Sequence, residues 1–286
     1  MGGGRVLVCG IAVLDHVHLV DALPSGGVKH RSHGLRMVGG GCAANAAVAI
    51  ARLGGEAILA TRLGDDAAGR WLAEALAAQG VRLLSPPAPG AQTPQSAVMV
   101  DAAGERMIVN FRGAGLPEEA PDLPDCDAVL ADTRWDAGAR AALAHARARG
   151  VPGVLDGEAP IGREAARLAS HVVFSAQGLR DFAGADDLDA ALDACDLPGR
   201  VAYTDGAAGV VWRDGPRIAP PVVEVVDTLG AGDVWHGAFA LALARGEGLD
   251  GASRFANHAA ATRCARAGGW EAWPTARDLE ASREAP

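Results

Sequence analysis

Short apolar runs alternate with segments of helical spacing over most of the chain. Residues 5–14 (RVLVCGIAVL) form a nearly continuous apolar run, whereas 137–149 places its apolar residues on one helix face. Strands without polar alternation are typical of a parallel sheet covered on both faces. The sequence therefore predicts repeated strand–helix units in an α/β fold, with further strands at 57–61, 127–132, 151–156, 171–174 and 200–204 and another helix at 69–79.

Two insertions alternate apolar and polar residues instead, as strands do when one face of their sheet is exposed. Residues 13–37 contain such a stretch and a second expected strand from Lys29 to Met37, and residues 93–113 have the pattern of a hairpin. We predict that the two insertions combine into one small β-sheet, a lid over the main domain. That main α/β domain would comprise residues 1–12, 38–92 and 114–286.

Residues 222–246 place an apolar run, a glycine turn and a helical pattern in succession. The valines of 222–226 predict a strand, and Gly230-Ala231-Gly232-Asp233 then opens a helix. Unpaired N–H groups and the positive end of the helix dipole favour an anion there. A carboxylate beside a bound phosphate is unfavourable unless it takes a proton from the attacking group. The stretch therefore predicts phosphoryl transfer, with Asp233 as the general base.

Composition and charge narrow the function classes. The chain has 286 residues and a formal charge of −9, which fits one large α/β domain with an appendage and argues against a nucleic-acid surface. The run at 5–14 is too short to span a membrane and is followed by Asp15 rather than a cleavage site. We expect a cytoplasmic protein without nucleic-acid or membrane partners, in which the five scattered cysteines are reduced.

Polar residues at the expected strand ends are candidates for a site, because ligands of open α/β sheets bind beyond the carboxyl ends of the strands. Four aspartates stand at such ends: Asp132, Asp156, Asp205 and Asp227. Some of these aspartates would have only a structural role, as caps of the elements that follow.

Two further features leave alternatives open. Gly39-Gly40-Gly41 opens an alanine-rich helix, and Asn45 in its first turn either binds sugar hydroxyls or lies on the surface. Lys29 is the single lysine among 26 basic residues. Because an ammonium group and a guanidinium fork are not interchangeable, Lys29 either marks a charged site or is an exposed loop residue.

Three glycine-rich blocks occur in an order that resembles the ribokinase-like, or PfkB, family of sugar kinases. They are Gly39–Gly41, the block from Gly64-Asp65 to Gly69, and Asp227-Thr228-Leu229-Gly230-Ala231-Gly232-Asp233. The last string is a specific signal, and no Walker A loop competes with it. The resemblance implies a three-layer α/β/α domain with a mostly parallel central sheet and a small β-sheet lid. It also implies transfer of the γ-phosphoryl group of ATP to a sugar hydroxyl.

The resemblance implies roles for individual residues. Asp233 is similar to the catalytic base of the family, and the backbone of Gly230, Ala231 and Gly232 would form an anion hole for the transferred group. The family pattern places Asp15, Gly40, Gly41 and Asn45 on the sugar, and Thr204, Gly206, Gly209 and Asn257 near the nucleotide.

The resemblance also implies Mg²⁺ as a cofactor, with K⁺ as a further candidate held by loop carbonyls near Asp227. Many family members carry an Asn-x-x-Glu whose acidic residue helps to organise magnesium, but this chain has Ser175-Ala176-Gln177-Gly178 there. Either nucleotide phosphates and water hold the metal, with help from Asp205 or Asp227, or activity is reduced.

Five segments resemble the bacterial sulfofructose kinases within this family: Pro94–Asp101, Gly104–Arg106, Ile108–Asn110, Leu130–Trp135 and Asp233–Gly237. In those enzymes a lysine, an asparagine and an arginine recognise the sulfonate, and the matching positions are Lys29, Asn110 and Arg134. The expected reaction is phosphorylation of 6-deoxy-6-sulfofructose to its 1-phosphate. The alternatives are a fructose, ketohexose or sugar-acid kinase, or a catalytically weak binding or sensor protein. The exposed edge of the lid sheet also predicts a homodimer through the lid.

Overall fold

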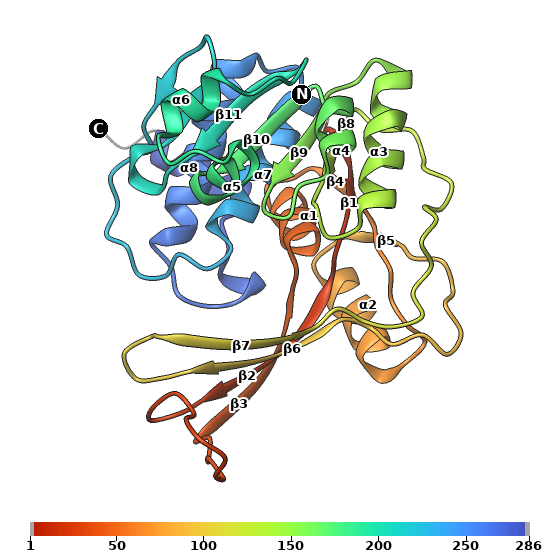
Figure 1. Ribbon diagram of the computed structural model, residues 1–286, viewed down its shortest axis with the longest axis vertical. Coiled ribbons are helices and arrows are strands. Elements are labelled where there is room, and N and C mark those ends of the chain that lie inside the picture. The colour runs from red at the N-terminus through yellow and green to blue at the C-terminus, as the bar shows by residue number, and fades with distance from the viewer. Residues whose placement is uncertain (1–2, 284–286) are drawn as a thin grey trace.

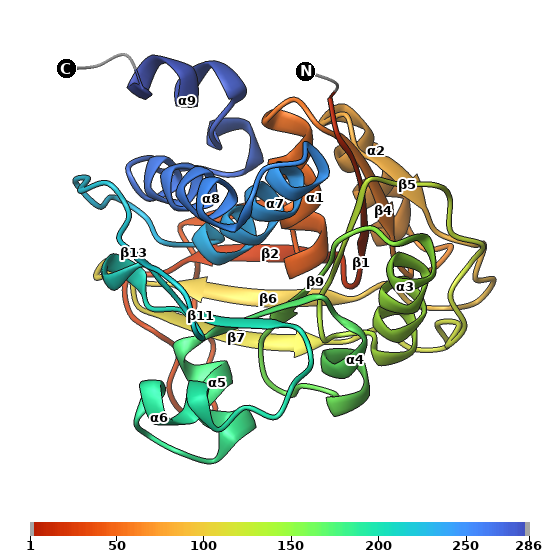
Figure 2. The ribbon, with the colours of Figure 1, turned by 90° about the horizontal axis from the view of Figure 1, so that it is seen from above.

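The computed structural model describes residues 3–283, and its main body is a sheet between two layers of helices (Figures 1 and 2). The strand order is β13-β12-β11-β10-β9-β8-β1-β4-β5, and the strands from β5 to β11 in this order run parallel. The strands are β1 (Arg5–Cys9), β4 (Glu56–Ala60), β5 (Arg82–Leu84), β8 (Ala128–Ala131), β9 (Gly153–Gly157), β10 (His171–Ser175), β11 (Arg200–Thr204), β12 (Val210–Trp212) and β13 (Arg217–Ile218).

Both faces of this sheet are buried, which is why its strands are apolar at nearly every position. In β1, Val6 and Val8 pack with one layer of helices, whereas Leu7 and Cys9 pack with the other. The first layer contains α1 (Cys42–Arg52), α2 (Ala67–Ala78), α7 (Ala231–Ala244), α8 (Leu249–Cys264) and α9 (Ala276–Arg283). The second contains α3 (Asp136–Arg149), α4 (Arg163–Leu168), α5 (Ala176–Ala183) and α6 (Leu188–Asp193).

The two alternating insertions form a second sheet, with strand order β3-β2-β6-β7. Its strands lie below the main body in Figure 1 and run past the helix layer that contains α1 and α7. The fold class, including the smaller lid sheet, is confirmed. The division into domains at the expected residues stays a prediction. The strands are β2 (Val13–Leu19), β3 (Gly34–Gly40), β6 (Gln95–Val100) and β7 (Arg106–Phe111).

Three expected strand boundaries are wrong. β3 begins at Gly34 rather than at Lys29, and it continues to Gly40. The run at 5–14 is not one strand, because β1 ends at Cys9 and β2 begins at Val13 in the other sheet. Gly10 lies between them with φ 156°, and a side chain there would collide with the carboxylate of Asp132 at 2.2 Å.

The expected strand at 222–226 is also wrong, because these residues have no strand conformation. Pro220 and Pro221 precede the run and supply no N–H groups for pairing with a neighbouring strand. Val222 is completely exposed, and Val225 and Val226 are exposed for more than half of their surface. Asp227 therefore does not stand at a strand end, although the glycine turn does open α7 as expected.

Close packing of α1 against α7 brings the starts of these two helices together. A methyl group on Gly237 of α7 would lie 2.6 Å from the carbonyl oxygen of Ala46 in α1, so only glycine allows this approach. The helices begin beside the carboxyl ends of β1 and β8, where the strand order reverses, since β4 and β5 continue on one side of β1 and β8 on the other. Ligand sites of open α/β folds are found at such reversals. No helix within residues 3–283 is both long and apolar enough to cross a membrane.

Candidate active site

The glycine turn opens α7, and Ala231 and Gly232 at the start of this helix line a pocket. Gly230 caps the helix in the left-handed conformation with φ 72°, and a side chain there would meet the ring of Trp273 at 2.9 Å. The N–H groups of Gly232 and Asp233 belong to the first turn, where a helix offers no internal acceptor. Among the residues expected to form the anion hole, Ala231 donates its N–H to the carbonyl of Thr228 at 3.2 Å. The exposed Gly232 is thus the member most open to a ligand.

Asn45 of α1 holds the carboxylate of Asp233. Its amide nitrogen donates to Oδ2 of Asp233 at 2.7 Å, and its amide oxygen accepts the indole N–H of Trp270 at 2.8 Å. Trp270 therefore fixes which way the amide faces, and the amide in turn fixes the carboxylate. Asn45 was expected on the sugar, and the structure shows that it also orients the expected base.

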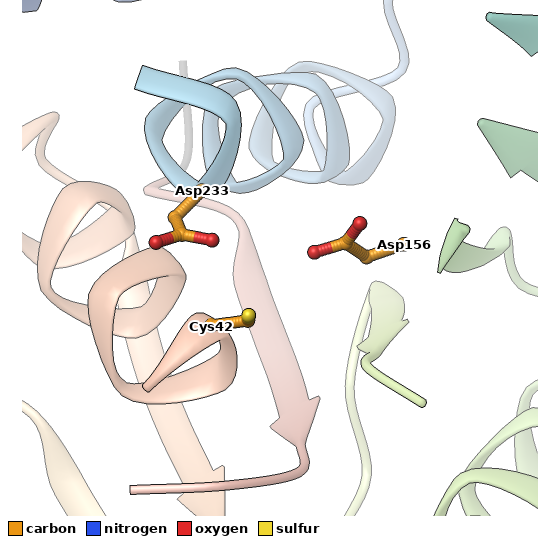
Figure 3. Close-up of side chains that lie close together, drawn as sticks. All are labelled: Cys42, Asp156 and Asp233. Atoms are coloured by element: carbon orange, nitrogen blue, oxygen red, sulfur yellow. The ribbon is translucent and has the colours of Figure 1, made fainter. Parts of the chain in front are cut away.

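Two further side chains lie against Asp233, as Figure 3 shows. Cys42, the first residue of α1, and Asp156 of β9 point toward it, and one thiol or carboxylate atom of each of the three residues lies within 4.8 Å of the others. Burial, and then the negative charge of Asp156, raise the pKa of Asp233 to about 7. Burial also raises the pKa of the Cys42 thiol well above its usual value, so Cys42 is a neutral neighbour.

His236 lies one turn further along α7 and connects the helix to the sheet. Its Nδ1 lies 2.9 Å from the carbonyl oxygen of Gly232, and its Nε2 lies 3.2 Å from that of Val173 and 3.6 Å from the Asp156 carboxylate. The His236 ring thus connects α7 with strands β9 and β10. Its interaction lowers the pKa values of Asp156 and Asp233, although burial keeps that of Asp156 above the usual range.

Two of the expected sugar residues, Asp15 and Gly40, lie side by side on the lid. Asp15 of β2 lies beside Gly40 of β3, where a side chain would meet the Asp15 carboxylate at 2.4 Å. A side chain on Gly41, which has φ 94°, would lie 2.6 Å from the carbonyl oxygen of Ile11. Burial raises the pKa of Asp15, and the hydrogen bond with Ser96 opposes this shift. Gly40 thus leaves room for the Asp15 carboxylate, and Gly41 leaves room for the backbone of Ile11.

Asp132 at the end of β8 has a structural role. Its carboxylate accepts backbone N–H groups of Ile11 at 2.8 Å, Arg134 at 2.8 Å and Ala43 at 3.1 Å. Burial raises its pKa to about 6, and these hydrogen bonds oppose the shift. One carboxylate therefore ties the ends of β1 and β8 to the start of α1.

The three residues expected to recognise a sulfonate have separate surroundings in the structure. Asn110 of β7 donates to the hydroxyl of Ser96 at 3.1 Å, and the guanidinium of Arg134 donates to the carbonyl of Ala159. Lys29 is exposed in the loop between β2 and β3, a loop at the outer end of the lid in Figure 1. No hydrogen bond connects any two of the three residues in the part of the chain that the structure describes.

A pocket of about 310 Å³ extends from the sheet edge to the start of α7. The expected nucleotide residues Thr204, Gly206, Gly209 and Asn257 all line it, together with Ala231 and Gly232. Asn257 connects two parts of the pocket wall. Its amide accepts the indole N–H of Trp235 at 2.7 Å and donates to the carbonyl of Ile218 at 2.7 Å. The valines of 222–225 line the pocket rather than the core.

Asp227, the expected cation ligand, is paired with arginines. Arg263, only 1% exposed, donates to its Oδ2 at 2.8 Å and also contacts the carbonyl oxygens of Asp227, Arg266 and Gly268. Arg106 of the lid lies 3.4 Å from Oδ1. Partial burial raises the pKa of Asp227, but the hydrogen bonds from Arg263 and Leu229 outweigh burial and lower it overall. The potassium site stays a prediction, and these contacts count against it.

The profile of the pfkB family of carbohydrate kinases matches residues 4–276. The chain belongs to this family. It is 29% identical to a ribokinase of Bacillus subtilis over 96% of this chain and 98% of that protein. Its fold is similar to that of an Agrobacterium tumefaciens protein named as a candidate ribokinase, with a TM-score of 0.90, 35% identity, and 98% and 97% of the two chains covered. It is also similar to that of an Arabidopsis thaliana ribokinase complexed with ribose and ATP, with a TM-score of 0.87, 24% identity and 99% of both chains covered. The expectation of a carbohydrate kinase is confirmed.

Sequence reasoning missed several residues of this site. Cys42 was assigned no role, and no spacing in the sequence connects it with Asp156, which lies more than a hundred residues away. Trp270 carried no signal, and His236 stood only within a segment that resembles sulfofructose kinases, with no role of its own. Asp156 was detectable as an aspartate at an apolar strand end, but not as a neighbour of Asp233.

The Asp156→Asn variant tests the coupling between the two carboxylates. The expected base, Asp233, would work deprotonated, so we expect the kcat of the wild type to rise with pH through about 7. Removing the charge of Asp156 lowers that pKa and should shift the acid limb to lower pH by roughly 1 unit. The exposed Asp250→Asn is the control. An unshifted acid limb in Asp156→Asn contradicts the coupling.

Because Arg263 is buried beside Asp227, we expect the activity not to depend on monovalent cations. Because its guanidinium already donates to the loop oxygens around Asp227, replacing potassium chloride with choline chloride at equal ionic strength should change activity less than about twofold. Arg263→Met should lower the free energy of unfolding by about 3 kcal/mol, because it leaves Asp227 without its buried partner. A many-fold activation of the wild type by potassium alone would show that the guanidinium does not take the place of the cation.

Proposed function

We propose that this carbohydrate kinase transfers the γ-phosphoryl group of ATP to a sugar hydroxyl, with Asp233 as the general base. The observation that carries the proposal is the pocket of about 310 Å³ that ends at Gly232, next to the Asp233 carboxylate. A nucleotide in this pocket would direct its phosphates toward the positive end of α7. The Arabidopsis thaliana ribokinase complexed with ribose and ATP supports ATP as the donor.

Different groups of the site would have different roles in the phosphoryl transfer. The N–H groups at the start of α7 would stabilise charge on the transferred phosphoryl group. Asn45 orients the carboxylate of Asp233, and the raised pKa of about 7 makes Asp233 a stronger base than an ordinary aspartate. Asp15, Gly40 and Gly41 would hold the sugar so that its hydroxyl lies between the base and the phosphorus.

The described residues offer few ligands for Mg²⁺. The Asp227 carboxylate is occupied by arginines, and Ser175 accepts the N–H of Gly178 as a helix cap. Asp205 next to the nucleotide pocket is exposed and free to contribute. Magnesium prefers to keep several waters and to bind phosphate oxygens, so the fit is to a metal that arrives with the nucleotide. The metal would supply charge neutralisation on the phosphates.

The preferred sugar is 6-deoxy-6-sulfofructose, phosphorylated at its 1-hydroxyl. The resemblance of the substrate segments to sulfofructose kinases supports this choice. Lys29 and Asn110 would join Arg134 when the lid closes over the sugar.

The lid also supports a homodimer. Its strands β3 and β7 are sheet edges with exposed apolar side chains, namely Leu35, Met37, Met107, Ile108, Val109 and Phe111. Exposed apolar sheet edges favour pairing with a second chain. Size-exclusion chromatography with light scattering should give twice the mass of one chain, and Ile108→Lys with Val109→Lys should give the mass of one. A monomeric wild type at micromolar concentration contradicts this assembly.

The Asp233→Asn variant tests the base. We expect kcat to fall by about 10²–10⁴-fold, because proton transfer is lost while the shape of the site is kept. Binding of ATP, measured by calorimetry, should change little. Turnover within tenfold of the wild type would exclude Asp233 as the base.

A substrate panel tests the identity of the sugar. ATP consumption should be fastest with sulfofructose, compared with fructose, fructose 6-phosphate and 2-keto-3-deoxygluconate. Replacing Lys29 or Asn110 with Ala should raise KM for sulfofructose by about tenfold with a smaller change for fructose, since only the former loses a charge-assisted contact. Equal effects on both sugars would reject sulfonate recognition by these residues.

A further inference from the structure

Three potential metal ligands converge beside the expected base, and phosphoryl transfer would use only one of them. Cys42 opens α1, Asp156 lies in β9 and Asp233 stands in the first turn of α7, and their side chains point toward one another (Figure 3). One sulfur or carboxylate oxygen of each residue lies within 4.8 Å of the other two. No other group of three histidine, cysteine or carboxylate side chains comes this close in the part of the chain that the structure describes.

The spacing of these three atoms fits a metal ion after a small movement. An ion at the centre of atoms within 4.8 Å of one another would lie at most about 2.8 Å from each of them. Zinc lies about 2.3 Å from sulfur and about 2.0–2.2 Å from carboxylate oxygen, so side-chain shifts of roughly 0.5–0.7 Å close the site. A tetrahedral ion with three protein ligands keeps its fourth position for water.

The Asp156 carboxylate supplies an observation that is independent of this spacing. Its side chain is only 7% exposed, yet the carboxylate accepts no hydrogen bond from any residue that the structure describes. The Nε2 atom of His236 lies 3.6 Å away, beyond hydrogen-bond distance, and Arg134 donates to the carbonyl of Ala159 instead. Buried carboxylates are normally hydrogen-bonded, paired or bound to a metal. Asp156 therefore points a carboxylate with unused acceptor capacity at Cys42 and Asp233.

The neighbours of the three residues hold them in place and leave a way in. Asn45 donates to Oδ2 of Asp233 at 2.7 Å, and Oδ1 of Asp233 accepts no hydrogen bond from a described residue. Such hydrogen bonds behind a ligand orient it in protein metal sites. Cys42 and Asp233 are only partly buried, so a cation can reach all three side chains from solvent.

One sulfur and two carboxylates select a class of cation. A thiolate favours zinc and softer divalent ions, whereas Mg²⁺ prefers oxygen ligands in an octahedral arrangement. When such an ion binds, Cys42 releases its thiol proton to solvent and the sulfur takes the ion as a thiolate. A cation on Asp233 would occupy the carboxylate that otherwise accepts the proton of the sugar hydroxyl. Binding and phosphoryl transfer would therefore exclude each other.

We infer that Cys42, Asp156 and Asp233 form a binding site for a thiophilic divalent cation, Zn²⁺ or an ion of the same class, and that the bound cation inhibits the kinase. The inhibition rests on the proposed function, because it acts through the general base, whereas the binding site itself does not. The Mg²⁺ that arrives with the nucleotide is a separate ion, held by phosphate oxygens.

Cobalt absorption spectroscopy tests the site without any substrate. Co²⁺ takes the place of zinc at thiolate sites, so we expect the wild type to develop a sulfur-to-cobalt charge-transfer band that Zn²⁺ abolishes and that Cys42→Ala lacks. Calorimetry should show zinc binding weakened at least about 100-fold in Cys42→Ala and about tenfold in Asp156→Asn. Cys126→Ser changes a buried cysteine of the other helix layer and is the matched control, with unchanged zinc affinity. A band that persists in Cys42→Ala, or equal zinc affinities of Cys42→Ala and the wild type, would place the ion elsewhere and overturn the inference.

Kinase assays test the inhibition, with each protein compared with its own turnover without zinc. Zn²⁺ should inhibit the wild type and Cys126→Ser, EDTA equimolar with the zinc should restore turnover, and about a hundredfold excess of Mg²⁺ should not. The zinc concentration for half inhibition should rise at least about 100-fold in Cys42→Ala.

Inhibition that EDTA does not reverse, or that Cys42→Ala shares equally, contradicts the inference. Failure to phosphorylate any sugar without zinc would overturn the proposed function and with it the inhibition, whereas the cobalt spectra decide the binding site by themselves.

Discussion

The close approach of two helix starts is the constraint on which the rest of the site depends. Gly237 allows α7 to lie against the backbone of Ala46 in α1, and this contact sets Asn45 and Asp233 within hydrogen-bond distance. The start of α7, which favours an anion, and the start of α1, whose Asn45 orients the Asp233 carboxylate, therefore form one rigid unit. Widening this contact by even the volume of a methyl group would separate Asp233 from the amide of Asn45.

The layered architecture could be predicted because its physical cause is local. Strands buried on both faces must be apolar throughout, and a lid with one exposed face must alternate, so both patterns are visible in the sequence. The errors have equally local causes. Gly10 ends β1 because Asp132 occupies the space of a side chain, and nothing in the run 5–14 reveals that distant carboxylate. The valines of 222–226 are apolar because they line a pocket, and composition alone cannot distinguish a pocket wall from a core strand.

The candidate site could be predicted only in part, for a related reason. The glycine turn and Asp233 form one continuous stretch with its own chemical logic, and family resemblance adds Asp15, Gly40 and Gly41. The side chains that lie against Asp233 come from elsewhere in the chain: Cys42 opens α1, and Asp156 lies inside β9. Their proximity is a product of strand order and helix packing. The role of Arg263 could not be predicted from the sequence either, because it depends on the loop oxygens of Asp227 that surround its guanidinium in the fold.

The ion pair between Arg106 and Asp227 joins the tip of the lid to the loop that begins the nucleotide pocket. Half-exposed pairs of this kind contribute about 0–1 kcal/mol, so the pair cannot lock the lid. The pair does link the position of the lid to the position of the loop that contains Asp227. A ligand that strengthens this pair through the lid favours the same position of the loop, and by reciprocity a ligand that strengthens it through the loop favours the same position of the lid by an equal free energy. A pair worth at most about 1 kcal/mol limits such coupling to a factor of about five in either affinity.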